Sequence, residues 1–425
     1  MSDSDRTPRD KVRDQYEAYP YPSRDPADEA RRLVVGSPSN LLEINHYLFA
    51  GRRDFTKPFR ALIAGGGTGD ATIMLAQQLS DVAARMSGSA AAAGEVVYLD
   101  LSTGARKVAE ARAAARGLSN IRFVTGSLLE LESLALGTFD YIDCCGVLHH
   151  LRDPEAGLAA LAGALAGDGG IGIMLYGTYG RSGVYPLQAV LRTMAGDRPL
   201  AEQVSVARRL LANLPPTNLF ARNPVLRDHT GSDAELVDLL LHSQDRSYTV
   251  DEIAALLGAA GLNLISFIEP LRYEPATYLK DPVLLRALDS LSPEGRAAIA
   301  EKLAGNLKTH VLYVSKRAAT DSLAWPYGPE AIPCLRVLDG AKLAKAVQRD
   351  LVLKGDFDGL ALKFPLPRLA PAILPWIDGR TSLGEIQTTL QALDPRQEWD
   401  HFKAQFDQLY QVLGGLNHLL IRYPV

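Results

Sequence analysis

The chain has 425 residues but only three cysteines and no long apolar run. Two of the cysteines, Cys144 and Cys145, are adjacent, so the three cannot form a disulfide framework and lack the spacing of zinc ligands. No apolar stretch approaches the ~20 residues that span a bilayer, and residues 1–6 are polar. We therefore expect a soluble protein of the reducing cytoplasm, with no metal site and no membrane segment.

Strong charge of one sign is also missing. The formal net charge is −4, and no long run of Lys or Arg occurs. Because proteins that bind nucleic acids generally carry a basic patch or stripe, we expect no general nucleic-acid binding, and RNA could be bound only through a local patch. The length is sufficient for two or three domains at roughly 150 residues each.

A glycine-rich turn follows the first predicted strand. The apolar residues 61–64 lead directly into four glycines, which are Gly65, Gly66, Gly67 and Gly69. Glycine lets a ligand approach the backbone, and the helix that follows directs its unpaired N–H groups at that ligand. A dinucleotide-binding turn needs Gly or Ala where this chain has Asp70, so the G-x-G-x-G spacing disfavours NAD and FAD.

Strand and helix patterns alternate after this turn. Buried-strand patterns occupy residues 95–100, 121–126, 139–145 and 171–176, with helices predicted between them. The first of these strands ends in Asp100, where an α/β sheet places the carboxylate that accepts hydrogen bonds from ribose hydroxyls. The pattern predicts an α/β fold that binds a nucleoside.

Three motifs then occur in a characteristic order. They are Ala-Gly-Gly-Gly-Thr-Gly at 64–69, Tyr-Leu-Asp-Leu-Ser at 98–102 and Phe-Asp-Tyr-Ile-Asp-Cys-Cys-Gly-Val-Leu-His-His-Leu at 139–151. With them, residues 40–317 resemble the class I S-adenosylmethionine-dependent methyltransferases. The resemblance implies a Rossmann-like, seven-stranded methyltransferase sheet, whose last strands are expected at 262–268 and 310–315. It also implies S-adenosylmethionine as the cofactor.

The resemblance implies a set of cofactor-binding residues. The glycines of the turn are expected near the methionyl part, Asp100 near the ribose and Leu101 against the adenine. The remaining members of the expected set are Ser127, Leu128, Gly146 and Tyr21. The chain departs from many relatives at Ile63, where they carry Asp or Glu, and at Ser127, where they carry Asp.

Methyl transfer from a sulfonium needs mainly alignment and, for some acceptors, removal of a proton. The candidates for catalytic roles are His149, Tyr176 and Asp245. Each has an alternative: His149 could position another group, Tyr176 could pack beneath the inserted helices, and Asp245 could form a structural pair with Arg246. His150 is interpreted as a structural histidine at a helix start.

Residues 1–50 are predicted to form an N-terminal arm. Prolines keep Tyr19 and Tyr21 in an extended segment, which suits a lid over the cofactor cleft. The alternative is that these tyrosines only pack the arm onto the domain. The methyltransferase domain is expected at 51–318, with an extended helix and loop at 81–94 and a helical insertion that shapes the acceptor site at 177–260.

A linker rich in proline, residues 325–329, precedes a last module at 333–425. The expected helices at 369–374, 383–393 and 399–413, followed by a strand at 417–423, suggest a small α+β, winged-helix-like domain. Residues 375–380 faintly resemble a turn in the C-terminal domain of bacterial protein-lysine methyltransferases. We expect this module to recruit or shape the acceptor, with a homodimer as one possible route.

Together these features predict a methyltransferase that acts on an N or O nucleophile of a small-molecule acceptor. The alternatives are a protein side-chain methyltransferase and a catalytically silent protein that binds S-adenosylmethionine or assists assembly. An oxidoreductase ranks third because the glycine spacing does not fit a dinucleotide.

Overall fold

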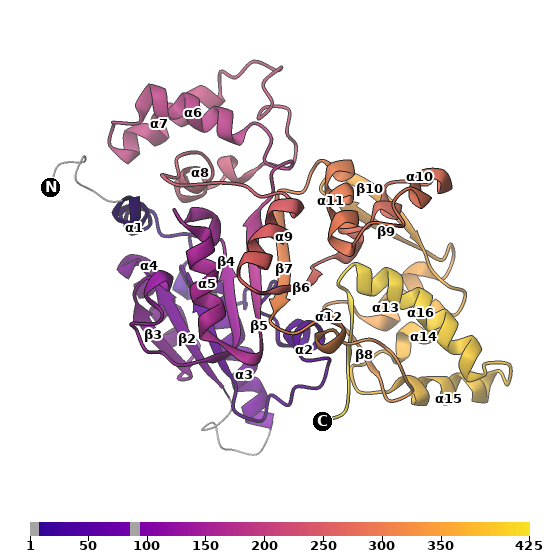
Figure 1. Ribbon diagram of the computed structural model, residues 1–425. Helices are drawn as coiled ribbons and strands as arrows, with labels where there is room; N and C mark the ends of the chain where they lie inside the picture. The colour runs from indigo at the N-terminus through magenta and orange to yellow at the C-terminus, as the bar shows by residue number, and fades with distance from the viewer. Residues whose placement is uncertain (1–7, 86–93) are drawn as a thin grey trace. The chain divides into compact units, whose positions relative to one another are not determined.

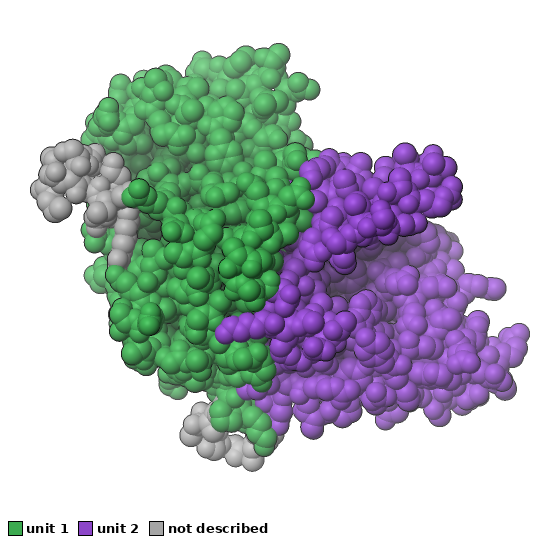
Figure 2. Space-filling view, viewed as in Figure 1, with its two compact units in different colours: residues 1–40, 55–262, 305–311 green, residues 41–54, 263–304, 312–425 purple. Residues whose placement is uncertain are grey.

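The computed structural model describes residues 8–85 and 94–425. The chain divides into two compact units. The first comprises residues 1–40, 55–262 and 305–311, and the second comprises 41–54, 263–304 and 312–425; Figure 2 colours them green and purple. In the described part of the chain, no helix is both long and apolar enough to cross a membrane.

The main feature is a seven-stranded sheet with the strand order β3-β2-β1-β4-β5-β7-β6. Its strands are β1 (Arg60–Ala64), β2 (Glu95–Asp100), β3 (Ile121–Thr125), β4 (Phe139–Cys145), β5 (Leu165–Tyr176), β6 (Asn263–Phe267) and β7 (Thr309–Ser315). The pairs among β1 to β5 are parallel, and β6 pairs with β7 antiparallel. This order confirms the predicted Rossmann-like methyltransferase sheet.

The central strands are buried because helices connect and cover them. Residues 61–64 of β1 and 96–99 of β2 are buried, as expected of parallel strands shielded on both faces. The connecting helices are α3 (Asp70–Arg85), α4 (Thr103–Ala115), α5 (Pro154–Ala164) and α9 (Val250–Ala259). The Ser102 side chain caps α4, and Thr249 opens α9 with a capping box. Most of the loop expected at 81–94 lies outside the described residues.

The predicted helical insertion lies at one end of this sheet (Figure 1). It contains α6 (Val184–Ala195), α7 (Leu200–Leu211), the short helix η5 (Asp228–Thr230) and α8 (Asp233–Leu240). Val184, Leu187, Val204 and Leu236 belong to an apolar core within the insertion. This core fixes the face of α8 that is turned toward the sheet.

Buried ion pairs hold the N-terminal segment, which contains α1 (Pro8–Ala18) and η2 (Pro26–Ala30). The guanidinium of Arg112 on α4 is 2.6 Å from Glu29 and 2.7 Å from Asp70. Asp70 also lies 2.5 Å from Arg24, and Arg116 pairs with Glu29. Arg112 and Glu29 are buried, so this cluster ties residues 24–29 to the start of α3 and to α4.

The second unit combines α2 (Leu41–Leu48) with the last third of the chain. It also contains β6 and residues 312–315 of β7 from the seven-stranded sheet. Its elements outside that sheet are η6 (Pro270–Tyr273), η7 (Pro275–Thr277), α10 (Pro282–Arg286), α11 (Pro293–Ala304), α12 (Ala319–Ser322), β8 (Ile332–Leu335), α13 (Gly340–Val347), β9 (Val352–Phe357), β10 (Leu360–Pro365), α14 (Ala370–Ile373), η8 (Leu374–Trp376), α15 (Leu383–Leu393), α16 (Trp399–Gly415) and β11 (Leu419–Arg422). β8 pairs with β11, and β9 with β10, both antiparallel. The winged-helix-like description and the domain boundaries at 50, 318 and 333 stay predictions.

Polar contacts join α2 to the C-terminal residues within this unit. The carboxylate of Glu43 is fully buried and accepts hydrogen bonds from Arg336 and Asn417, each at 2.8 Å. Nδ1 of His46 accepts the Ile421 N–H at 2.9 Å, and burial lowers the pKa of His46 to about 4. The imidazole therefore remains neutral at physiological pH.

Candidate functional site

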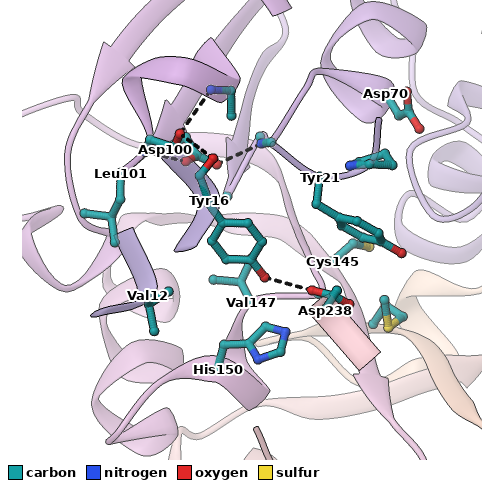
Figure 3. A pocket seen from close by; sticks show the side chains of 18 of the residues that line it. Val12, Tyr16, Tyr21, Asp70, Asp100, Leu101, Cys145, Val147, His150 and Asp238 are labelled. Carbon is teal, nitrogen blue, oxygen red and sulfur yellow. Dashed lines mark hydrogen bonds between the residues drawn. The ribbon is translucent and has the colours of Figure 1, made fainter. Parts of the chain in front are cut away.

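A cavity of about 490 Å³ opens at the carboxyl ends of the parallel strands, and all its lining residues belong to the first unit. Residues that follow β1, β2, β3, β4 and β5 all contribute to it. Ligands of α/β sheets bind at this edge. The arm supplies Tyr16 and Tyr21, and the insertion supplies Asp238, so three parts of the chain meet here (Figure 3).

The glycine turn forms one wall of the cavity. Gly67 has φ 51°, and a Cβ atom there would lie 2.8 Å from the carbonyl oxygen of Tyr21. Gly69 has φ 103° and packs against Ala109 of α4, without lining the cavity. Gly65 and Gly66 line it together with Gly67. The turn thus needs glycine at 67 and 69 both for backbone conformation and for close packing.

Asp100 connects the turn to the end of β2. Its two carboxylate oxygens accept the N–H groups of Gly67 and Ser102, each at 2.8 Å. Burial raises its pKa, and these main-chain donors oppose that rise. Since a carboxylate has about four acceptor positions, Asp100 retains capacity for ligand hydroxyls on the cavity side, where Leu101 also lies.

The remaining predicted cofactor residues also line the cavity, namely Tyr21, Ser127, Leu128 and Gly146. The Ser127 hydroxyl accepts the Leu129 N–H at 3.2 Å in a capping box with Glu130. Its O–H can still donate, whereas the aspartate of many relatives can only accept. The arm closes against the turn here, because the Thr68 hydroxyl donates to the Pro22 carbonyl at 2.6 Å.

A carboxylate that the sequence analysis did not select lies beneath the turn. Asp143 of β4 is the register partner of Ile63 and lines the cavity. The Ser39 hydroxyl donates to it at 2.6 Å, and burial raises its pKa to about 6. Many relatives carry Asp or Glu at the position of Ile63. This chain instead has a carboxyl group at the paired position of the neighbouring strand.

A second missed carboxylate, Asp238 of α8, lies at the other end of the cavity from Asp100 (Figure 3). Its oxygens accept hydrogen bonds from the hydroxyls of Tyr16, at 3.1 Å, and of Tyr176, at 2.7 Å. Burial is the main cause that raises the pKa of both tyrosines, so both remain neutral donors. The signal in the sequence was weak because α8 also carries Asp233 and Glu235, so Asp238 reads as one more acidic residue of an amphipathic helix.

Two histidines stack beside this carboxylate, with their ring centroids 3.7 Å apart. Nδ1 of His150 is 2.8 Å from the Gln244 carbonyl oxygen and must donate to it, so in the neutral form of the ring Nε2 is the proton acceptor. Nδ1 of His242 accepts the Gln244 N–H at 3.0 Å, and burial keeps its pKa well below the usual value. Neutral His242 therefore carries its proton on Nε2, which lies 3.2 Å from the Tyr16 hydroxyl.

Of the three predicted catalytic residues, only Tyr176 lines the cavity. His149 is fully buried and stacks on the Tyr176 ring at 3.8 Å. Its two nitrogens have no hydrogen-bond partner among the described residues, and burial lowers its pKa well below the usual range. Asp245 is buried in an ion pair with Arg181 at 2.9 Å and accepts from Gln188. The catalytic roles of His149 and Asp245 stay predictions.

Comparisons with known proteins show which proteins the chain is similar to. The methyltransferase domain family matches residues 62–171. An uncharacterized protein of a Synechococcus strain is 30% identical over 321 residues, which cover 73% of this chain and 72% of that protein. Two structures of PKMT2 from Rickettsia typhi share the fold. One has a TM-score of 0.62 at 13% identity and covers 88% of this chain and 74% of that one.

The second structure is PKMT2 in complex with AdoHcy, with a TM-score of 0.60 at 14% identity over 90% of this chain and 74% of that one. The structure has a glycine turn at the cavity, a carboxylate after β2 and the strand order of this fold. These features indicate the same protein family as the comparisons do. The chain therefore belongs to the class I S-adenosylmethionine-dependent methyltransferases, and it is an enzyme whose cofactor is S-adenosylmethionine.

Proposed function

We propose that this methyltransferase transfers a methyl group to a nitrogen or oxygen nucleophile of a small molecule. The observation that carries the proposal is the enclosed polar group at the Asp238 end of the cavity. Asp238, His242 and Tyr176 are each less than 10% exposed, and Tyr16 of the arm hydrogen-bonds to the carboxylate. A site built from buried side chains beneath an arm suits an acceptor small enough to be surrounded.

The cofactor assignments form part of the proposal. Asp100 accepts from the ribose hydroxyls, Leu101 and Leu128 pack on the adenine, and Ser127 donates to its edge. The main chain of Gly65 to Gly67, with Gly146, surrounds the methionyl part, while Tyr21 covers it. When bound, the cofactor supplies a methyl group on a positively charged sulfur, so the protein needs to orient the acceptor and remove its proton.

A protein side chain is the second candidate acceptor. It is favoured by the extent of the likeness to PKMT2, a protein methyltransferase, because that likeness covers 88% of this chain. A match of this extent must include residues beyond the methyltransferase sheet. The role of residues 333–425 in acceptor recruitment, or in a homodimer, belongs to this alternative.

Transfer of a labelled methyl group separates the candidates. The protein is incubated with methyl-tritiated S-adenosylmethionine and either a small-molecule extract or a dialysed protein extract, with Asp100→Ala as the control. Label in the small-molecule fraction supports the proposal, whereas label confined to protein favours the second candidate. Tight binding of the cofactor without transfer to either extract would favour the silent binding protein.

A further inference from the structure

Asp238 is a buried carboxylate without a cationic partner. It is 5% exposed, and within the described residues no Lys, Arg or His nitrogen lies within 4.0 Å of it in an ion pair. Arg181, the buried cation nearby, is already paired with Asp245. The same cavity is also lined by the acids Asp70, Asp100, Asp143, Asp228 and Glu235 and by the cations Arg13, Arg181 and Lys308, so acids outnumber cations along it. A desolvated carboxylate held only by neutral hydroxyls is expected to bind a cation.

A metal ion does not fit this cluster well, although His150, Asp238 and His242 each place a possible ligand atom within 4.8 Å of the others. The proton of His242 is on Nε2, because its Nδ1 accepts the Gln244 N–H. A protonated nitrogen cannot be a ligand, so this cluster offers a metal ion only the carboxylate of Asp238 and one nitrogen of His150.

An ammonium group fits the same atoms. It brings only hydrogen-bond donors, and the cluster offers the carboxylate of Asp238 and the unprotonated Nε2 of His150. We propose that the methyl acceptor is an amine, bound as an ammonium ion by Asp238 and deprotonated by Nε2 of His150. This inference rests on the proposed function and specifies its substrate class.

The transfer balances with the groups already described. One proton moves from the ammonium nitrogen to Nε2 of His150, which becomes an imidazolium. The freed lone pair of the nitrogen forms the new bond to the methyl carbon, while the electron pair of the carbon–sulfur bond returns to sulfur. The positive charge thus passes from sulfur to the methylated nitrogen, which lies beside the carboxylate of Asp238.

Sinefungin tests this inference without knowledge of the acceptor. In this analogue a carbon replaces the sulfonium sulfur and its primary amine replaces the methyl group, so the ammonium group occupies the position of the transferred methyl and points into the acceptor site. S-adenosylhomocysteine has the same framework without that amine. Calorimetry should give at least a tenfold tighter Kd for sinefungin than for S-adenosylhomocysteine in the wild type, since charge-assisted hydrogen bonds are the strong ones.

Asp238→Asn should remove most of this preference and leave the Kd of S-adenosylhomocysteine within about threefold. Asp233→Asn is the matched control, because it removes one exposed carboxylate of the same helix outside the cavity and should keep the preference. Equal binding of the two analogues by the wild type, or an unchanged ratio in Asp238→Asn, would overturn the inference. Failure of both analogues to bind the wild type would instead contradict the proposed function.

A second experiment asks whether the amine belongs to a small molecule or to a lysine side chain. Methyl transfer is measured with phenethylamine and spermidine, with polylysine, and with 2-phenylethanol as the hydroxyl analogue. Transfer to the free amines supports a small-molecule acceptor, and transfer to polylysine alone supports a lysine side chain. Transfer to 2-phenylethanol at the rate of phenethylamine would overturn the amine inference. If addition of divalent metal restores transfer after chelation, the cluster is a metal centre and the inference also fails.

Discussion

The contact between Asp100 and the glycine turn makes Asp100→Ala a quantitative test of the cofactor site. The substitution removes an acceptor of two main-chain hydrogen bonds, from Gly67 and Ser102, and leaves its expected ribose partners without a carboxylate. Hydrogen bonds to charged groups contribute about 1.5 to 3 kcal/mol each. At ~1.4 kcal/mol per factor of ten, loss of the ribose contact alone weakens binding by about tenfold to a hundredfold.

Calorimetric titration with S-adenosylmethionine measures this change, and thermal unfolding checks that the variant is folded. Asp100→Asn is the informative companion, because its amide oxygen can still accept one main-chain N–H while the negative charge is lost. We expect its affinity to lie between those of the wild type and Asp100→Ala. A folded Asp100→Ala protein with wild-type affinity would refute the ribose assignment.

Four further predictions concern the rest of the molecule. His150→Gln should slow transfer to the acceptor by about a hundredfold or more, as for loss of a general base, with cofactor affinity unchanged by calorimetry; a rate within threefold of wild type would contradict it. Burial raises the pKa of Asp143 to about 6, so between about pH 4 and 6 this carboxyl is protonated in the folded protein and ionised in the unfolded chain. The free energy of unfolding therefore falls by up to ~3 kcal/mol as pH rises from about 4 to 6. In urea unfolding, Asp143→Asn should remove this dependence of the unfolding free energy on pH. An unchanged pH dependence would be inconsistent with a buried carboxyl that ionises in this range. Glu43→Ala should lower the free energy of unfolding by about 3 kcal/mol, because it leaves Arg336 without its buried partner; urea midpoints measure this, and a loss below about 1 kcal/mol would argue against it. S-adenosylmethionine should slow hydrogen exchange of residues 12–24, and equal exchange with and without cofactor would count against a covering arm.

The fold was predictable wherever one segment carried its own signal. The strand at 139–145 and the helix at 383–393 agree with β4 and α15 at both ends. In contrast, β5 begins at Leu165, before the predicted 171, because Gly167, Asp168 and Gly169 interrupt the apolar pattern. The hairpin of β9 and β10 was missed because neither segment alternates regularly between apolar and polar residues, and most of their side chains are exposed or only partly buried.

The cofactor end of the site was predictable because its residues stand next to one another in short motifs. The acceptor end depends on contacts between distant residues, such as Tyr16 with Asp238, which are 222 positions apart. No local pattern distinguishes Asp238 from a surface residue of a helix. Likewise, His149 and His150 are adjacent in sequence, and the sequence does not show which of them faces the acceptor. In the structure, the hydrogen bond from Nδ1 of His150 to the Gln244 carbonyl fixes the orientation of that ring near Asp238.

The ion pairs of Arg112 separate a part of the arm that is anchored by buried charges from a part that is held by hydrogen bonds. Residues 24–29 are held by Arg112 and Asp70, whereas Tyr21 and Tyr16 precede this anchor and line the cavity. The residues before the anchor are held by hydrogen bonds from Thr68 to the Pro22 carbonyl, from the Thr103 and Gly104 N–H groups to Glu17, and from Tyr16 to Asp238. Because the same stretch of chain lines both the Asp100 end and the Asp238 end of the cavity, we expect exchange of the cofactor and release of the methylated product to depend on the same set of hydrogen bonds.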